Sequence, residues 1–182
     1  LFRTKHFWIV TLQFAIAIAF ALVAFTLPGP KFFQLSLAVF WLLAFSSATH
    51  DIAADGFYLL AMKPGEQAAF VGVRSTFYRL ASLSAQGGLV YLAGMWTTST
   101  GSVTQAWSLV FGLLAAVFLV VGTYHFFALP KPVSDVATSR GQKPVQAFFA
   151  VFGHFLRKPD ILTALAMLLL YRLAESQALK LH

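Results

Sequence analysis

Five long apolar runs, separated by short polar or proline- and glycine-containing breaks, dominate the pattern of the chain. The runs occupy residues 6–27, 32–62, 68–96, 105–129 and 160–182. Each is long enough to cross a hydrocarbon core of about 30 Å as a helix. Proline next to glycine marks a turn, so the breaks near residues 28–30 and 63–67 favour short connections between neighbouring helices. The pattern predicts an all-α integral membrane protein with five transmembrane helices.

The composition supports this class and removes several others. Hydrophobic residues make up 59% of the chain, charged residues make up 10%, and the mean hydropathy is +0.76. A soluble domain is far less apolar. The formal net charge of +7 is scattered between the apolar runs and forms no cationic face, so no nucleic-acid partner is expected. Because the chain has no cysteine, thiol catalysis, disulfides and cysteine-ligated metals are excluded.

The basic residues predict how the chain is oriented. They gather at Arg3 and Lys5, in the turn 63–67 and in the stretch 130–159, whereas the other two breaks are nearly or wholly uncharged. Cytoplasmic loops carry the excess of lysine and arginine, so these three regions are predicted to be cytoplasmic. The chain also starts without methionine directly before an apolar run and stops within another, so we expect an internal fragment of a larger membrane protein.

The hydrophilic stretch 130–159 contains two patterns. Residues 130–144 include proline, serine, glycine and lysine, which predicts a flexible connection between two helical bundles. From residue 145 onward apolar side chains recur on one stripe, so an amphipathic helix is predicted at about residues 145–157. Such a helix fits the inner membrane surface, and a short helix packed under the bundle fits equally well.

Two carboxylates interrupt the second apolar run. Asp51 and Asp55 are four residues apart, which places them one turn apart on the same face of a helix. Ionisable groups in membrane helices face a bundle interior, a partner charge or water. Counted from the turn at residues 63–67, Asp55 matches Arg74 in depth and Asp51 matches Arg79. Both pairs are available, but depth does not fix how the helices are rotated. A structural ion pair and direct handling of substrate or protons both remain open.

Three uncharged or weakly basic side chains accompany these charges. Tyr78 and Gln86 follow Arg74 at helical spacing, so either could line a hydrophilic cavity or simply pack. His50 titrates in the range useful for proton transfer, and it could instead be a hydrogen-bonded packing residue.

The segment Ser47–Gly56 resembles the signature Ser-Ala-(Ser/Thr)-Gln-Asp-Ile-x-x-Asp-(Ala/Gly) of the AmpG-type muropeptide permeases. This family is a branch of the major facilitator superfamily and also resembles the acetyl-CoA transporters. Tyr78-Arg79-Leu80 with the following glycine pair, and the segment Leu170–Glu175, resemble two further helices of the family in the expected order. The resemblance implies that the chain covers helices three to seven of a transporter with twelve to fourteen. Residues 1–129 would then belong to the N-terminal bundle, 130–159 to the central cytoplasmic loop, and 160–182 to the first helix of the C-terminal bundle.

The same resemblance implies a function. A transporter of this family would import a muropeptide-like or other small anionic solute with protons by alternating access, as a monomer in the bacterial inner membrane. It would be no enzyme and would need no cofactor or metal. Arg172 is the best candidate for a clamp on a substrate anion, because guanidinium binds carboxylates in a bidentate manner. Glu175 could be its counter-ion or a proton site, or the two could form a plain intrahelical pair.

Other functions stay open beside this one. Within transporters, a sugar, a peptide or an acyl-CoA-like molecule is an alternative substrate. An intramembrane prenyltransferase could use the Asp-x-x-x-Asp spacing to hold Mg²⁺, but the chain has no second acid-rich motif. A membrane scaffold or receptor without transport activity is the third alternative.

Overall fold

The computed structural model describes residues 4–132, 135, 150 and 153–180. The chain divides into two compact units, Leu1–Ala137 and Thr138–His182. In the first unit the helices are α1 (Lys5–Thr26), α2 (Phe32–Ala61), α3 (Pro64–Leu83), the π-helix η1 (Ser84–Gly88), α4 (Leu89–Thr100) and α5 (Val103–Ala128). The second unit contains α7 (Ile161–Lys180). The predicted all-α class is therefore confirmed for the described residues.

Three of the helices are long and apolar enough to cross a membrane, namely α1, α2 and α5. They begin and end within one or two residues of the predicted runs. Helix α7 contains a shorter apolar stretch, Ile161–Tyr171. These features are consistent with a multi-pass membrane protein. The number of five membrane spans stays a prediction. The division of the chain into parts at residues 129 and 159 also stays a prediction.

Polar side chains fix several helix ends. The Thr4 hydroxyl accepts a hydrogen bond from the backbone N–H of Phe7 (3.3 Å), and the Ser102 hydroxyl accepts one from Gln105 (3.4 Å). These bonds satisfy N–H groups that have no partner within the first helical turn. Gly101 ends α4 with φ of 68°, a left-handed conformation that glycine adopts without steric cost. The chain can therefore turn back at once into α5.

The third apolar run differs from the single helix predicted at residues 68–96. Helix α3 begins at Pro64, and a π-helical segment separates it from α4. There the backbone N–H of Leu89 donates to the carbonyl of Ser84, five residues back. Small residues, including Gly87 and Gly88, make room for this wider turn, and π-segments often mark functional positions.

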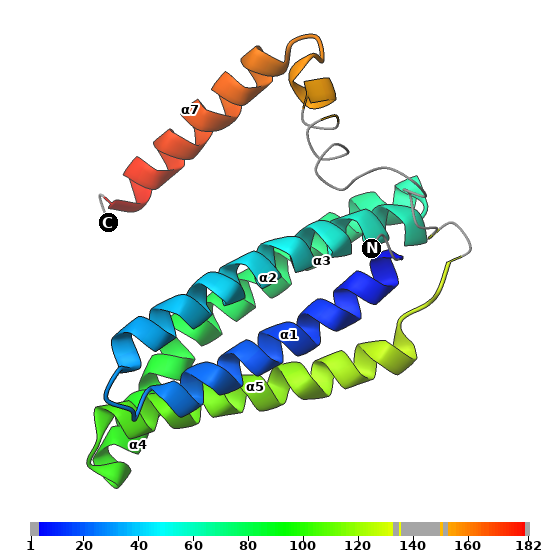
Figure 1. Ribbon diagram of the computed structural model, residues 1–182. Helices are drawn as coiled ribbons and strands as arrows, with labels where there is room; N and C mark the ends of the chain where they lie inside the picture. The colour runs from blue at the N-terminus through cyan, green and yellow to red at the C-terminus, as the bar shows by residue number, and fades with distance from the viewer. Residues whose placement is uncertain (1–3, 133–134, 136–149, 151–152, 181–182) are drawn as a thin grey trace. The chain divides into compact units, whose positions relative to one another are not determined.

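Helix α1 lies between α2 and α5 and forms the centre of the first unit (Figure 1). Its buried apolar side chains are Ile9, Val10, Leu12, Ile16, Ala17, Ala19, Val23 and Ala24. Small residues allow close approach of helices where no hydrophobic effect drives them together. Gly122 of α5 is one such position, because a Cβ there would lie 3.4 Å from the Cβ of Gln13. The Ser108 hydroxyl also donates across to the carbonyl of Ala24 (2.6 Å).

The beginning of the predicted flexible connection is held in place. Asp135 is buried, and its carboxylate accepts hydrogen bonds from the backbone N–H groups of Lys5 (2.8 Å) and His6 (3.0 Å). Asp135 thus ties the segment after α5 to the N-terminus of α1. Of the amphipathic helix predicted at about residues 145–157, residues 153–156 are helical, and most of its N-terminal part lies outside the described residues.

Candidate functional site

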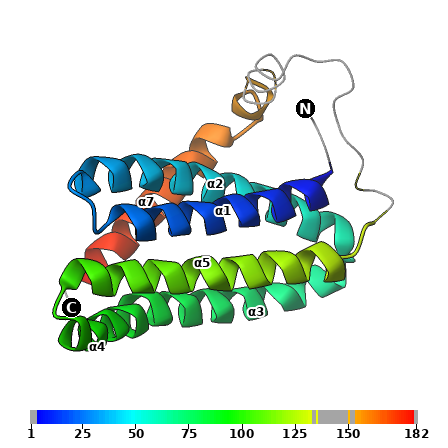
Figure 2. The same cartoon turned by 60° about the horizontal axis from the view of Figure 1, so that its bottom comes forward.

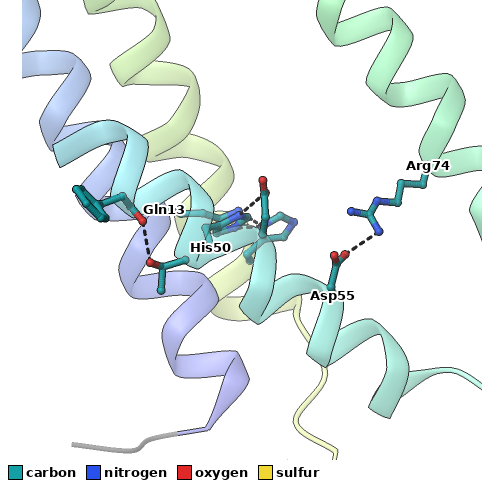
Figure 3. A network of polar contacts seen from close by, with 8 residues as sticks. Gln13, His50, Asp55 and Arg74 are labelled. Atoms are coloured by element: carbon teal, nitrogen blue, oxygen red, sulfur yellow. Dashed lines mark hydrogen bonds and ion pairs between the residues drawn. The ribbon is translucent and has the colours of Figure 1, made fainter. Parts of the chain in front are cut away.

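An ion pair joins α2 to α3 near the turn between them. Nη1 of Arg74 lies 2.7 Å from Oδ1 of Asp55 (Figure 3). The Arg74 side chain is 61% exposed and that of Asp55 is 51% exposed within this chain. This ion pair is one of the two that the sequence predicted from the equal depth of the charged residues along neighbouring helices.

Contacts near the turn hold α2 and α3 together at this level. The Tyr58 hydroxyl donates to the carbonyl of Gln67, and the Gln67 amide donates to the carbonyl of Met62 (2.9 Å). The rings of Tyr58 and Phe70 also lie next to each other, with centroids 5.9 Å apart. The Asp55–Arg74 pair therefore forms where the two helices are still close.

Farther from the turn, α2 and α3 separate (Figure 2). No ion pair joins Asp51 to Arg79 within the described part of the chain, because the distance between the helices has grown at that depth. Tyr78, Arg79 and Gln86 are exposed, and none of them lines the crevice around the Asp55–Arg74 pair.

Asp51 is paired differently. Its Oδ1 lies 3.7 Å from Nδ1 of His50 on the same helix. The His50 side chain is 20% exposed, and its Nε2 is buried with no hydrogen-bond partner among the described residues. A buried ring nitrogen without a partner is costly, so it marks a place where a water molecule or a polar ligand atom is expected.

Gln13 and His125 form a polar contact between α1 and α5. Nδ1 of His125 lies 2.8 Å from Nε2 of Gln13 and 3.0 Å from its Oε1. Gln13 is only 5% exposed, and Gly122 leaves it room beside α5. Sequence reasoning did not single out this pair. Each residue is a polar interruption of an apolar run, but the two are 112 positions apart and the sequence gives no sign that they meet.

Two cavities border these groups. The α2–α3 crevice has a volume of about 290 Å³ and is lined by Asp51, Ala54, Asp55, Tyr58, Phe70 and Arg74. The α1–α2–α5 cavity, of about 490 Å³, is lined mainly by apolar and aromatic side chains, with Ser47, His50 and Asp51 at its polar part. Asp51 lines both cavities. This carboxylate therefore lies beside His50 and also in the crevice that contains the ion pair.

The remaining predicted site residues are in the second unit. Arg172 and Glu175 belong to α7, but their side chains lie outside the described part of the structure, so their predicted roles stay predictions. Within the described residues, no three histidine or acidic side chains gather as metal ligands would.

The fold and site define an all-helical chain that is apolar enough to cross a membrane and carries a polar cluster between its helices. The chain is similar to the anhydromuropeptide permeases of Escherichia coli strain K12 and of Escherichia coli O157:H7, with 25% identity to each over 183 residues. The similarity covers 99% of this chain and 34% of each permease, so the chain spans about a third of the length of these curated relatives. No protein-family model matches the chain. No solved structure matches it either.

Proposed function

We propose that this chain is part of a secondary active transporter that imports a small anionic solute, such as a muropeptide, together with protons. The observation that carries the proposal is the similarity to a permease along 99% of the chain. The protein would be a monomer without enzymatic activity or cofactor in the bacterial inner membrane. The region of Arg3 and Lys5, the turn 63–67 and the stretch 130–159 would face the cytoplasm.

The polar cluster supports transport on physical grounds. Ionisable groups inside membrane helices are expensive, and they mark substrate or proton pathways more often than packing contacts. In alternating access, helical bundles rock around a site near the membrane midplane, so charge pairs between helices can form in one state and separate in the other. The Asp55–Arg74 pair lies within the predicted N-terminal bundle, so it would serve as a fixed counter-ion pair or as a polar part of the pathway. Arg172 would bind the anionic group of the substrate, with Glu175 as its counter-ion or as a proton site.

Uptake by cells that express the full-length protein tests this proposal. We would measure uptake of a labelled anhydromuropeptide, with and without an uncoupler, at matched membrane abundance. The test variants are Asp51→Asn and Arg172→Ala. Their matched controls are Asp160→Asn and Arg157→Ala, which make the same chemical changes away from the cluster. Asparagine tolerates the positive φ of 61° at Asp160 about as well as aspartate does.

The expected result is uptake that the uncoupler abolishes, that both test variants lose, and that both controls keep. Absence of uptake by abundant wild-type protein would refute the muropeptide as substrate and direct the assay to sugars, peptides and acyl-CoA-like anions. If wild-type uptake is present but neither test variant affects it, the charges have no part in transport.

A further inference from the structure

The Gln13 amide is placed to satisfy His125 in either protonation state. Its nitrogen and its oxygen both lie within hydrogen-bond distance of the same ring nitrogen, at 2.8 and 3.0 Å from Nδ1. When Nδ1 is unprotonated, the amide N–H can donate to it. When Nδ1 carries a proton, the amide oxygen can accept from it. A small rotation of a buried side chain thus follows the arrival or departure of one proton.

A second histidine completes the arrangement. His50 of α2 lies within electrostatic range of His125, and Figure 3 shows it beside Gln13. Its Nε2 is buried without a hydrogen-bond partner in the described structure, while its Nδ1 faces the Asp51 carboxylate at 3.7 Å. Positive charges on both rings would repel each other, so a state with one added proton is favoured over a state with two. We call Gln13, His50 and His125 the histidine cluster.

One member of the histidine cluster, His50, lines a cavity. The α1–α2–α5 cavity of about 490 Å³ is lined by His50 and Asp51, and Asp51 also lines the crevice that contains the Asp55–Arg74 pair. The cluster therefore borders this cavity through His50, so a proton that enters from the cavity would reach the His50 ring first. Protonation forms an N–H bond on the imidazole and breaks an O–H bond of a hydronium ion in the cavity, and release of the proton reverses both changes.

Among the described residues, the groups nearest the cluster come from helices α1, α2, α4 and α5. From α1 the group that faces His125 is the uncharged Gln13, and from α2 it is His50 with Asp51 behind it. On its own helix the ring of Tyr124 lies beside His125, with centroids 5.6 Å apart. Helix α4, which also packs on α5, carries Tyr91 as its one ionisable side chain, and that side chain is 75% exposed.

We propose that the histidine cluster binds the coupling proton of transport, one proton per transport cycle. This inference rests on the proposed transporter function and names where its proton is held. The Asp55–Arg74 pair would then sense the protonation of the cluster through Asp51. His125 would be a proton-binding residue, and Gln13 a positioning residue that acts through it.

The test separates proton coupling from substrate movement. The full-length protein is reconstituted in liposomes and assayed with labelled anhydromuropeptide in two modes: exchange across the membrane without a gradient, and accumulation driven by an imposed pH gradient. The variants are His125→Gln and His50→Gln, which keep hydrogen-bonding capacity without titrating. His154→Gln, a histidine outside the cluster, is the control.

With one proton per substrate, a gradient of one pH unit drives accumulation of at most about tenfold in the wild type and the control. We expect His125→Gln to exchange substrate at a rate close to that of the wild type but to show no accumulation. Its exchange rate should also lose its dependence on pH.

Three outcomes would overturn the proposal. Accumulation that persists in both variants shows that the proton is held elsewhere, while the transporter function stands. Loss of exchange together with accumulation in both variants, at normal abundance, shows that the cluster has a structural role. Exchange by the wild type with no gradient-driven accumulation removes proton coupling altogether. A wild type that fails even to exchange would instead contradict the proposed function for this substrate.

Discussion

The contact between Gln13 and His125 should contribute measurably to the stability of the helix pair α1 and α5. Gln13→Leu keeps the volume of the side chain approximately but removes both atoms that face Nδ1 of His125. Nδ1 of His125 then loses its partner on α1 at a site that is only partly open to water. A buried polar group left without a partner costs about 1–3 kcal/mol. The single substitution is therefore expected to destabilise the protein by an amount in that range.

Removing both partners should cost less than the sum of the two single changes. In Gln13→Leu/His125→Leu no polar atom of the pair stays buried, and replacing both partners by apolar groups can be nearly neutral. Hydrogen bonds between membrane helices show coupling energies of about 0.6 kcal/mol on average and up to about 1.7 kcal/mol. Because this contact is short and its Gln13 side is buried, we expect the double-mutant cycle to give a value in the upper half of that range.

Denaturant unfolding of the full-length protein in detergent micelles measures the cycle. The matched control combines Gln13→Leu with Thr98→Val. Thr98 lies on α4, and its hydroxyl donates to carbonyl groups of its own helix. In this control, the changes in the free energy of unfolding of the two single variants should add up to that of the double variant within about 0.5 kcal/mol. If the free-energy changes in the Gln13/His125 cycle add up as they do in the control, the Gln13–His125 contact does not stabilise the packing of α1 against α5.

Two further changes test the surroundings of the same interface. Asp135→Ala removes the acceptor for the N–H groups of Lys5 and His6, so it should cost about 1 kcal/mol, whereas Asp135→Asn keeps one acceptor oxygen and should cost less. Equal melting temperatures for all three proteins would show that the contact with α1 is not needed. At Gly122 an added Cβ would meet Gln13 and Phe14 at 3.4–3.7 Å, which is ordinary contact. Gly122→Ala should therefore be tolerated, whereas Gly122→Leu should destabilise the protein by about 1–3 kcal/mol through overpacking. Denaturant unfolding in micelles measures both free energies. Similar losses of stability for the two variants would contradict this packing.

The sequence predicts the positions of the helices well because their ends are marked chemically. Pro28, Gly29 and Pro30 end the first run, and α1 ends at Thr26. The charged and proline-containing turn at 63–67 separates α2 from α3. Apolar length alone could not predict the π-segment at Ser84–Gly88, because the choice between α and π hydrogen bonding depends on local packing and not on hydropathy.

The candidate site was predictable only in part, because side-chain contacts depend on helix rotation and divergence. Depth along the helix axis gave the Asp55–Arg74 pair, since depth follows from counting residues. The same counting suggested Asp51 and Arg79 equally, and the divergence of α2 and α3 keeps those two apart. The Gln13–His125 contact needs both the rotation of α1 and the packing of α5 beside it, which no local pattern contains.

Asp51 is the residue at which the two parts of the site depend on each other. Its side chain is 71% exposed, and its distance of 3.7 Å from His50 is longer than a hydrogen bond. The carboxylate lines both the α1–α2–α5 cavity and the α2–α3 crevice, and no short contact among the described residues fixes it to either. On one side it lies beside the His50 ring, and on the other side it lies in the crevice that Asp55 and Arg74 line. A single carboxylate can thus couple the charge of the histidine cluster to the contact between α2 and α3.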